Sequence, residues 1–282
     1  MGGMLVMRRL LISVLMLMFF LSAEGNIIAA DPQVDLKLKP DEFALSFLPF
    51  AKGEVAIIHL PEGINYLVNT GESTQLKDLA SILNKYGINK IRGVLVTDPI
   101  EYHPEALKEI SEKWGVEEIL TGSKLAEGFL IPGLNIRSLV KGDKLELNQE
   151  VSIDIMYEGN QVNEGLDFTV TSLPHRFLWL SSHSHIAEDA LINEQLNDVN
   201  ILKVPLYDKT ELLSERLLNH IDPQTAIFYR EKKRYINTDL LELFHESWID
   251  VYFTGQHGLI TIKFNKNNYE VITFPEENQV LG

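Results

Sequence analysis

Cysteine is absent from the 282-residue chain, and basic residues are scarce. Without a thiol the protein can form no disulfide, thiolate zinc site or iron–sulfur cluster, and it has no cysteine nucleophile. The 25 lysine and arginine residues are outnumbered by 40 aspartate and glutamate residues, which gives a formal net charge of −15. This balance argues against a broad basic surface for nucleic acid. Any metal site would have to use histidine and carboxylate ligands.

Several sequence motifs of common enzyme classes are missing as well. The chain has no phosphate-binding glycine-rich loop, no serine nucleophile elbow and no dinucleotide-binding fingerprint. Hydrophobic residues nevertheless make up 45% of the sequence, which is enough for a buried core in a chain of this length. The composition therefore predicts a folded acidic protein and leaves its chemistry open.

The first thirty residues have the pattern of an export signal. Arg8 and Arg9 precede an apolar stretch over residues 10–23 that only two serines interrupt. A charged start followed by a short apolar run is typical of a secretory signal peptide, and the run is short for a membrane span. We expect residues 1–30 to be a signal peptide or an uncleaved anchor that contacts the membrane only through residues 5–23. Either alternative places the protein outside the cytoplasm, secreted or anchored, with a partner that the sequence does not identify.

Strand and helix patterns alternate through the rest of the chain. We expect an extended leader at residues 31–43, one domain over residues 44–275 and a tail at residues 276–282. Strands are expected at 44–49, 55–60, 65–69, 93–97, 117–121, 136–140, 151–156, 168–173, 177–180, 201–204, 225–229, 251–253, 259–264 and 270–274, and helices at 73–86, 104–114, 187–196, 211–220 and 239–246. Two halves that mix strand meanders with crossover helices predict an α/β fold, an αββα sandwich of two packed mixed sheets with outer helices.

The three tryptophans give a further prediction about the core. Trp114, Trp179 and Trp248 sit at apolar periodic positions of the sequence. A large aromatic side chain at such a position usually packs in the interior. We therefore expect all three to be buried.

Six short stretches of sequence follow one another in a recognisable order between residues 44 and 264. They read FLPFAKGEVAII with YLVNTG, IRGVLVT, GDKLEL, RFLWL, LKVP and VYFTGQHGLITI. Together they resemble the metallo-β-lactamase-fold domain of ComEC, a bacterial DNA-uptake channel protein. The resemblance implies an αββα sandwich whose metal ions are bound at one edge, by loops at the strand ends. The chain lacks the channel's membrane segments, so a role in DNA uptake does not follow from the resemblance.

The loop that would carry the family's metal motif has lost most of its ligands. In the family, an H-x-H-x-D-H loop holds two metals that activate a bridging water. Here the loop reads TDPIEYHPE, and alignment on Thr97 places Asp98 at the first histidine, Ile100 at the second ligand, Tyr102 at the aspartate and only His103 in register. The other family ligand positions fall near Ser182 or His183 and at Leu206, Tyr207 and about Tyr235. We therefore expect no metal cofactor and predict a pseudoenzyme, a non-catalytic binding or structural protein of the cell envelope.

A relocated site for a single metal ion is the alternative. His183 and His185 follow a predicted strand two residues apart, so both imidazoles could point the same way. With His103 they could bind zinc or manganese, and Asp98 or Glu101 would serve as a further ligand or as the base of a phosphodiesterase or esterase. The same SSHSH stretch also fits a polar loop that caps the following helix.

A basic cluster lies late in the chain. It consists of Arg230, Lys232, Lys233 and Arg234, and Tyr229 and Tyr235 flank it. Aromatic rings beside cations can bind an anionic polymer or a phosphate group. An ordinary solvated connection is the other interpretation, because charge runs usually lie in water.

Overall fold

The computed structural model describes residues 33–128, 133–159, 164–205, 213–229 and 238–275. The chain divides into two units, residues 1–33 and residues 34–282, and every element named below belongs to the second. The expected signal segment and the C-terminal tail lie outside the described residues. Within the described ranges, no helix has the length and apolar character needed to cross a membrane.

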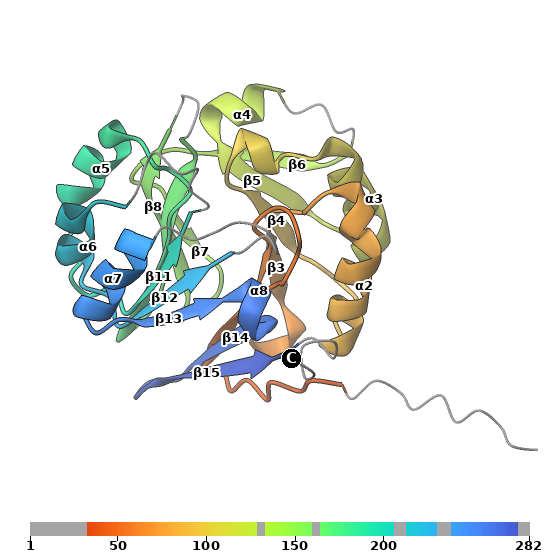
Figure 1. Ribbon diagram of the computed structural model, residues 1–282. Helices are drawn as coiled ribbons and strands as arrows, with labels where there is room; N and C mark the ends of the chain where they lie inside the picture. The colour runs from red at the N-terminus through yellow and green to blue at the C-terminus, as the bar shows by residue number, and fades with distance from the viewer. Residues whose placement is uncertain (1–32, 129–132, 160–163, 206–212, 230–237, 276–282) are drawn as a thin grey trace, which may run out of the picture. The chain divides into compact units, whose positions relative to one another are not determined.

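Two β-sheets form the centre of the second unit (Figure 1). The first contains β1 (Phe43–Phe47), β2 (Ala56–His59), β3 (Asn65–Val68), β4 (Gly93–Val96), β5 (Glu118–Gly122), β6 (Asn135–Leu139), β14 (Leu259–Phe264) and β15 (Tyr269–Phe274), in the order β15-β14-β1-β2-β3-β4-β5-β6. The second contains β7 (Lys144–Glu146), β8 (Ser152–Glu158), β9 (Leu166–Ser172), β10 (His175–Trp179), β11 (Ile201–Val204), β12 (Thr225–Phe228) and β13 (Asp250–Phe253), in the order β13-β12-β11-β10-β9-β8-β7. Both sheets are mixed, because β3 to β6 and β10 to β13 pair in parallel and the other pairs are antiparallel.

Helices cover the outer faces of both sheets (Figure 1). On the first sheet these are α2 (Leu76–Lys85) and α3 (Pro104–Trp114), whose apolar residues pack with those of β2 to β5 in one cluster. On the second they are α5 (His185–Ile192), α6 (Glu215–Ile221) and α7 (Thr238–Glu246), which pack against β10 to β12. Two short helices, α4 (Ser123–Gly128) and α8 (Thr254–His257), join strands. The αββα sandwich expected from the sequence is confirmed.

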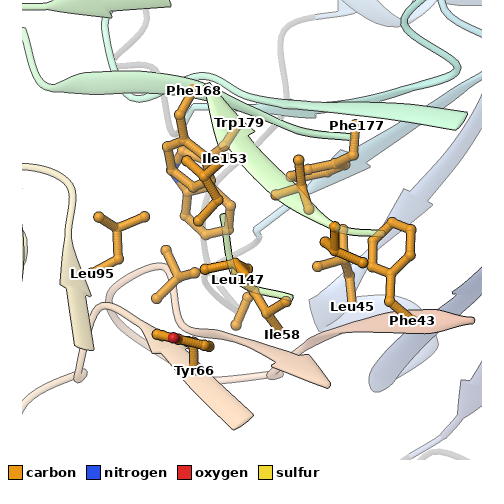
Figure 2. Packing of buried hydrophobic residues seen from close by; sticks show 14 of the residues in the cluster. Phe43, Leu45, Ile58, Tyr66, Leu95, Leu147, Ile153, Phe168, Phe177 and Trp179 are labelled. Atoms are coloured by element: carbon orange, nitrogen blue, oxygen red, sulfur yellow. The ribbon is translucent and has the colours of Figure 1, made fainter. Parts of the chain in front are cut away.

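The main core lies between the two sheets, and aromatic side chains fill much of it. Figure 2 shows Phe168 and Trp179 of the second sheet pointing toward Leu95 and Tyr66 of the first, and all four are buried. The rings of Phe168 and Trp179 stack with their centroids 5.9 Å apart. Because side chains alternate along a strand, the residues between these inward positions pack against the helices instead. Three hydrophobic layers result, and the middle one joins the sheets.

Most predicted element boundaries agree with the structure to within a few residues. Helix α3 begins at Pro104 and ends before Gly115, which takes the left-handed conformation that lets a glycine end a helix. Helix α5 occupies residues 185–192 and not the expected 187–196, because Ser184 caps it by accepting a hydrogen bond from the Ala187 amide. The short elements α4 and β7 were not predicted, since three to six residues carry too little periodicity to be recognised.

The prediction for Trp248 is wrong, whereas those for Trp114 and Trp179 are confirmed. Trp114 and Trp179 are buried, but 92% of Trp248 is exposed. Trp248 lies in the turn between α7 and β13 with a positive φ of 57°. This turn conformation directs the side chain away from the apolar face to which the helical spacing had assigned it.

Close backbone contact joins the two sheets at one edge. The amide of Leu166, at the start of β9, donates a 2.7 Å hydrogen bond to the carbonyl of Thr97, just beyond β4. Gly165 makes this approach possible, because a Cβ atom there would lie 2.5 Å from the Thr97 oxygen and 2.7 Å from Cβ of Ser181. A glycine is therefore required where the loops of the two sheets meet.

We expect Gly165→Ala to lower the free energy of unfolding by about 1–3 kcal/mol, the usual cost of forcing extra atoms into a packed site. Chemical denaturation followed by tryptophan fluorescence measures the change. Gly128→Ala is the matched control, because its Cβ would meet nothing within 4 Å. Equal stability of the two variants would contradict the close-approach argument.

Candidate functional site

Asn69 fixes the strand ends at which the site begins. Its side-chain oxygen accepts a 2.9 Å hydrogen bond from the Thr97 amide, and its side-chain nitrogen donates a 2.8 Å bond to the Glu54 carbonyl. Asn69 itself has a positive φ of 58°, which asparagine tolerates better than most residues. One buried amide thereby connects the end of β3, the residue after β4 and the segment before β2.

The loop after β4 presents two carboxyl groups at this edge. Asp98 accepts a 2.7 Å hydrogen bond from the Ile100 amide and begins a short 3-10 helix, Pro99–Glu101. Burial raises the pKa of Asp98, while the charges of Lys203 and His183 lower it. Glu101 points inward and accepts a hydrogen bond from the Glu54 amide at 3.2 Å. Burial, aided by the negative charge of Glu54, raises the pKa of Glu101 to about 7.

A fully buried lysine lies beneath these carboxyl groups. Lys203 on β11 donates a hydrogen bond to the carboxylate of Glu54 and another, at 2.8 Å, to the Leu180 carbonyl. Its ammonium group also lies 4.6 Å from the centroid of the Trp179 ring and 5.9 Å from that of Tyr229, within cation–π range. The lysine side chain therefore enters the core between the sheets and ends in an ion pair.

Asp167 is a second buried carboxyl group that the sequence analysis did not select. Its Oδ1 atom accepts hydrogen bonds from the amides of Ser181 (2.6 Å) and Ser182 (2.9 Å). Burial raises the pKa of Asp167 to about 6, against the opposing effect of these amides and of Lys203. Its Oδ2 atom has no hydrogen-bond partner among the described residues.

The structure brings some of the predicted site residues together and leaves others apart. Asp98 and His183 are close enough for the charge of one to affect the pKa of the other. His103 immediately precedes α3, and His185 is the exposed first residue of α5. In the ranges that the structure describes, no three His, Asp or Glu side chains gather so that they could hold a metal ion. The metal role of His103, His183 and His185 stays a prediction.

The side chains present at this edge do not match the donor set of a two-metal centre. Ile100 is 69% exposed and carries no ligand atom, and a cationic ammonium group occupies the interior beside Glu54. A metal ion requires several convergent neutral imidazoles or carboxylates. The predicted anion-binding residues Arg230, Lys232, Lys233 and Arg234, together with Leu206, Tyr207 and Tyr235, lie outside the described residues.

Sequence reasoning missed Glu54 and Lys203 as well as Asp167. The first two could have attracted attention. Both lay in stretches already quoted for the family resemblance, GEVAII and LKVP. The signal that could have revealed Lys203 is a single charged residue within the four-residue buried strand Ile201–Val204. A charge at such a position is rarely stable without a partner of opposite sign. No spacing rule, however, links Lys203 to a glutamate 149 residues earlier.

A cavity of about 420 Å³ opens beside Asp98. Its walls come from the loop after β4, the β5–α4 junction and the β8–β9 connection. The lining residues are Thr97, Asp98, Pro99, Ile100, Thr121, Gly122, Lys124, Leu125, Glu158, Gly159, Glu164, Gly165 and Leu166. Its volume is within the range of small-molecule sites.

Solved structures share the architecture of this chain, although no protein-family model and no curated protein sequence matches it. The metallo-β-lactamase-fold protein YhfI from Bacillus subtilis aligns with a TM-score of 0.53 and 11% identity, over 76% of this chain and 96% of YhfI. Igni18, a metallo hydrolase from the archaeon Ignicoccus hospitalis, gives a TM-score of 0.50 and 11% identity, over 83% of this chain and all of Igni18 (100%). A long-form RNase Z from yeast gives 0.57 and 10%, over 83% of this chain and 49% of the yeast protein. At these identities the likeness establishes the fold alone, and the chain has the metallo-β-lactamase fold.

We expect Lys203→Met to lower the free energy of unfolding by about 3–5 kcal/mol, because it removes the cation that pairs with the buried Glu54 carboxylate. The double variant Glu54→Gln, Lys203→Met should lose less than the sum of the two single variants. Urea denaturation at pH 7 measures all four proteins of this cycle. Lys90→Met is the control, since Lys90 and its partner Glu117 are exposed and such pairs contribute about 0–1 kcal/mol. Strict additivity of the cycle would show that the ion pair contributes nothing.

Asp167 predicts a pH dependence of stability. A carboxyl group whose pKa rises on folding binds its proton more tightly in the folded state, so the stability it confers falls as pH increases. With a shift from 3.8 to about 6, the loss between pH 4 and pH 7 is about 2 kcal/mol. Asp167→Asn removes the ionisation and keeps an oxygen for the two serine amides. The variant should therefore gain stability relative to the parent as pH rises from 4 to 7. A pH-independent difference in unfolding free energy would refute this.

Proposed function

We propose that this protein is an exported, non-catalytic binding protein of the cell envelope, in which the ammonium group of Lys203 supplies the positive charge that metal ions supply in metallo-β-lactamase-fold hydrolases. The observation that carries this proposal is the buried ion pair of Lys203 with Glu54 at the edge where the sheets meet. Export rests on the N-terminal pattern of Arg8, Arg9 and the apolar run 10–23.

The charges around Lys203 support this interpretation. Burial raises the pKa values of Asp98, Glu101 and Asp167, and the Lys203 charge opposes the rise at each of them. One internal cation therefore acts on all three carboxyl groups in addition to its own partner. The fully buried ammonium group of Lys203 already pairs with the Glu54 carboxylate, so Glu54 is not available as a metal ligand at this edge.

We also propose a more specific relationship, to the ComEC-type domain. The six sequence stretches from FLPFAKGEVAII to VYFTGQHGLITI resemble the ComEC-type domain in pattern. We infer that the chain descends from such a domain and that its metal motif has degenerated at Asp98, Ile100 and Tyr102. Binding of an envelope or extracellular partner would then have replaced hydrolysis.

One observation favours a second function. His183 lies near Asp98, so an imidazole and a carboxylate come together at the strand ends, where the family resemblance implies a metal site. Under this alternative, His103, His183 and His185 bind one zinc or manganese ion, and the protein hydrolyses a phosphodiester or another ester. Two side chains alone do not make a three-ligand site, so we rank this function below the first.

Metal content separates the two functions. We expect residues 31–282, purified without chelator and then exposed to zinc or manganese, to retain no metal above background. The melting temperature should be the same in EDTA and in either metal, because the charge at the site is internal. The measurements are elemental analysis and differential scanning fluorimetry.

Retention of a metal ion would support the hydrolase instead. About one tightly held ion per chain, lost in the double variant His183→Ala, His185→Ala, would reject the non-catalytic proposal and support the hydrolase. Glu188→Gln, on the same helix, is a control for effects of substitution that are unrelated to metal binding. Phosphodiester and ester substrates would then be tested with the metal-loaded protein.

A further inference from the structure

The cavity beside Asp98 combines apolar walls with carboxylates of fixed orientation. Pro99, Ile100, Leu125 and Leu166 supply the apolar part of its lining. Ile100 is unusual among them, because a large apolar side chain is 69% exposed although its backbone is held by Asp98. An exposed apolar side chain at the mouth of a cavity gains most when a ligand covers it.

Two of the carboxylates keep one oxygen occupied by the protein and the other available. Oε1 of Glu158 accepts hydrogen bonds from the amide (2.6 Å) and the hydroxyl of Ser123. Oδ1 of Asp98 accepts the Ile100 amide. Within the described ranges, the hydrogen bonds of these two carboxylates use these oxygens only, which fixes the carboxylates in place and leaves Glu158 Oε2 and Asp98 Oδ2 to a ligand.

The third carboxylate belongs to a buried polar network. Glu164 is buried and accepts a 2.6 Å hydrogen bond from the hydroxyl of Ser184. Its charge and its hydrogen bond contribute, after burial itself, to a pKa of about 12 for Tyr157. The network adds negative charge to one wall of the cavity. Among the described residues of the lining, Lys124 is the single basic one, and its side chain is exposed.

We propose that this cavity binds an organic ammonium compound, with its apolar body against Ile100, Leu125 and Leu166 and its charged nitrogen between Asp98 and Glu158. The inference names the ligand class of the binding function proposed above and rests on it. Among the described lining residues, three acidic side chains against one lysine favour a cation, and the apolar walls favour an organic cation over a small hydrated ion. An ammonium group has three N–H donors and can therefore hydrogen-bond to more than one carboxylate oxygen.

Other ligand classes fit the same walls less well. A carboxylate or phosphate would bring negative charge beside Asp98, Glu158 and Glu164, and repulsion would oppose its binding. A neutral apolar molecule would fill the volume but bring no positive charge to the carboxylates. The charge of the ligand head group is therefore the property to vary in a test.

Isothermal titration calorimetry of the full mature protein in EDTA can compare three probes of equal chain length, n-octylammonium, n-octanol and n-octanoate. We expect n-octylammonium to bind most tightly and n-octanoate to give no heat of binding. Glu158→Gln and Asp98→Asn keep the oxygens that accept the local hydrogen bonds but remove the charge. Each should weaken n-octylammonium binding about tenfold, the usual worth of one charge-assisted hydrogen bond.

Ile100→Lys provides a variant that leaves the core untouched, because the side chain is mostly exposed. It places a cation at the cavity mouth and should abolish n-octylammonium binding, whereas Ile100→Met should retain it within about twofold. Glu150→Gln, in the exposed turn between β7 and β8, is the control for loss of charge elsewhere. Circular dichroism of each variant verifies its fold.

The outcomes separate the inference from the proposed function. Equal affinity for n-octanol and n-octylammonium, no binding of any probe, or unchanged affinity in Glu158→Gln and Asp98→Asn would overturn the ammonium site. None of these results changes the metal content, which tests the non-catalytic function independently. A protein that retains metal but binds n-octylammonium as described would overturn the proposed function and leave the cavity assignment standing.

Discussion

The buried ion pair between Lys203 and Glu54 is the constraint on which the site depends. A lysine in the middle of a central strand is stable only because Glu54, the Leu180 carbonyl and the ring of Trp179 surround its ammonium group. Its charge in turn opposes the effect of burial on Asp98, Glu101 and Asp167. Removing Lys203 would take away the positive charge that acts on all of these carboxyl groups.

The packing of the two sheets determines where these charges can meet. Glu54 precedes β2 of the first sheet, whereas Lys203 lies on β11 of the second, so their contact joins the two layers at the core. Asn69 holds the first-sheet strand ends, and Gly165 admits the Thr97 carbonyl at the start of β9. The position of the ion pair therefore follows from the register of strands that are far apart in the sequence.

This dependence explains what the sequence could and could not predict. The strands, the main helices and the sandwich followed from apolar periodicity and from local signals such as Pro104 and Gly115, which depend on near neighbours. The loop containing Asp98 and Ile100 was located through its resemblance to a known motif. The partnership of Lys203 with Glu54 and the burial of Asp167 could not be predicted, because each depends on contacts between distant segments. The predicted burial of Trp248 was wrong for a related reason. The residue lies in a turn with positive φ, which apolar spacing along the sequence does not reveal.

The separation of the ion pair from the cavity gives the two parts of the site different roles. Lys203 and Glu54 are buried in the core and cannot contact a ligand, so they hold the strand ends in position. Asp98 connects the two parts, because it responds to the charge of Lys203 and also lines the cavity. A permanently placed ammonium group cannot exchange ligands or polarise a bound water as a metal ion does. What it does is lower the pKa of Asp98 at the cavity wall against the effect of burial, and this carboxylate is the group that a bound cation would contact.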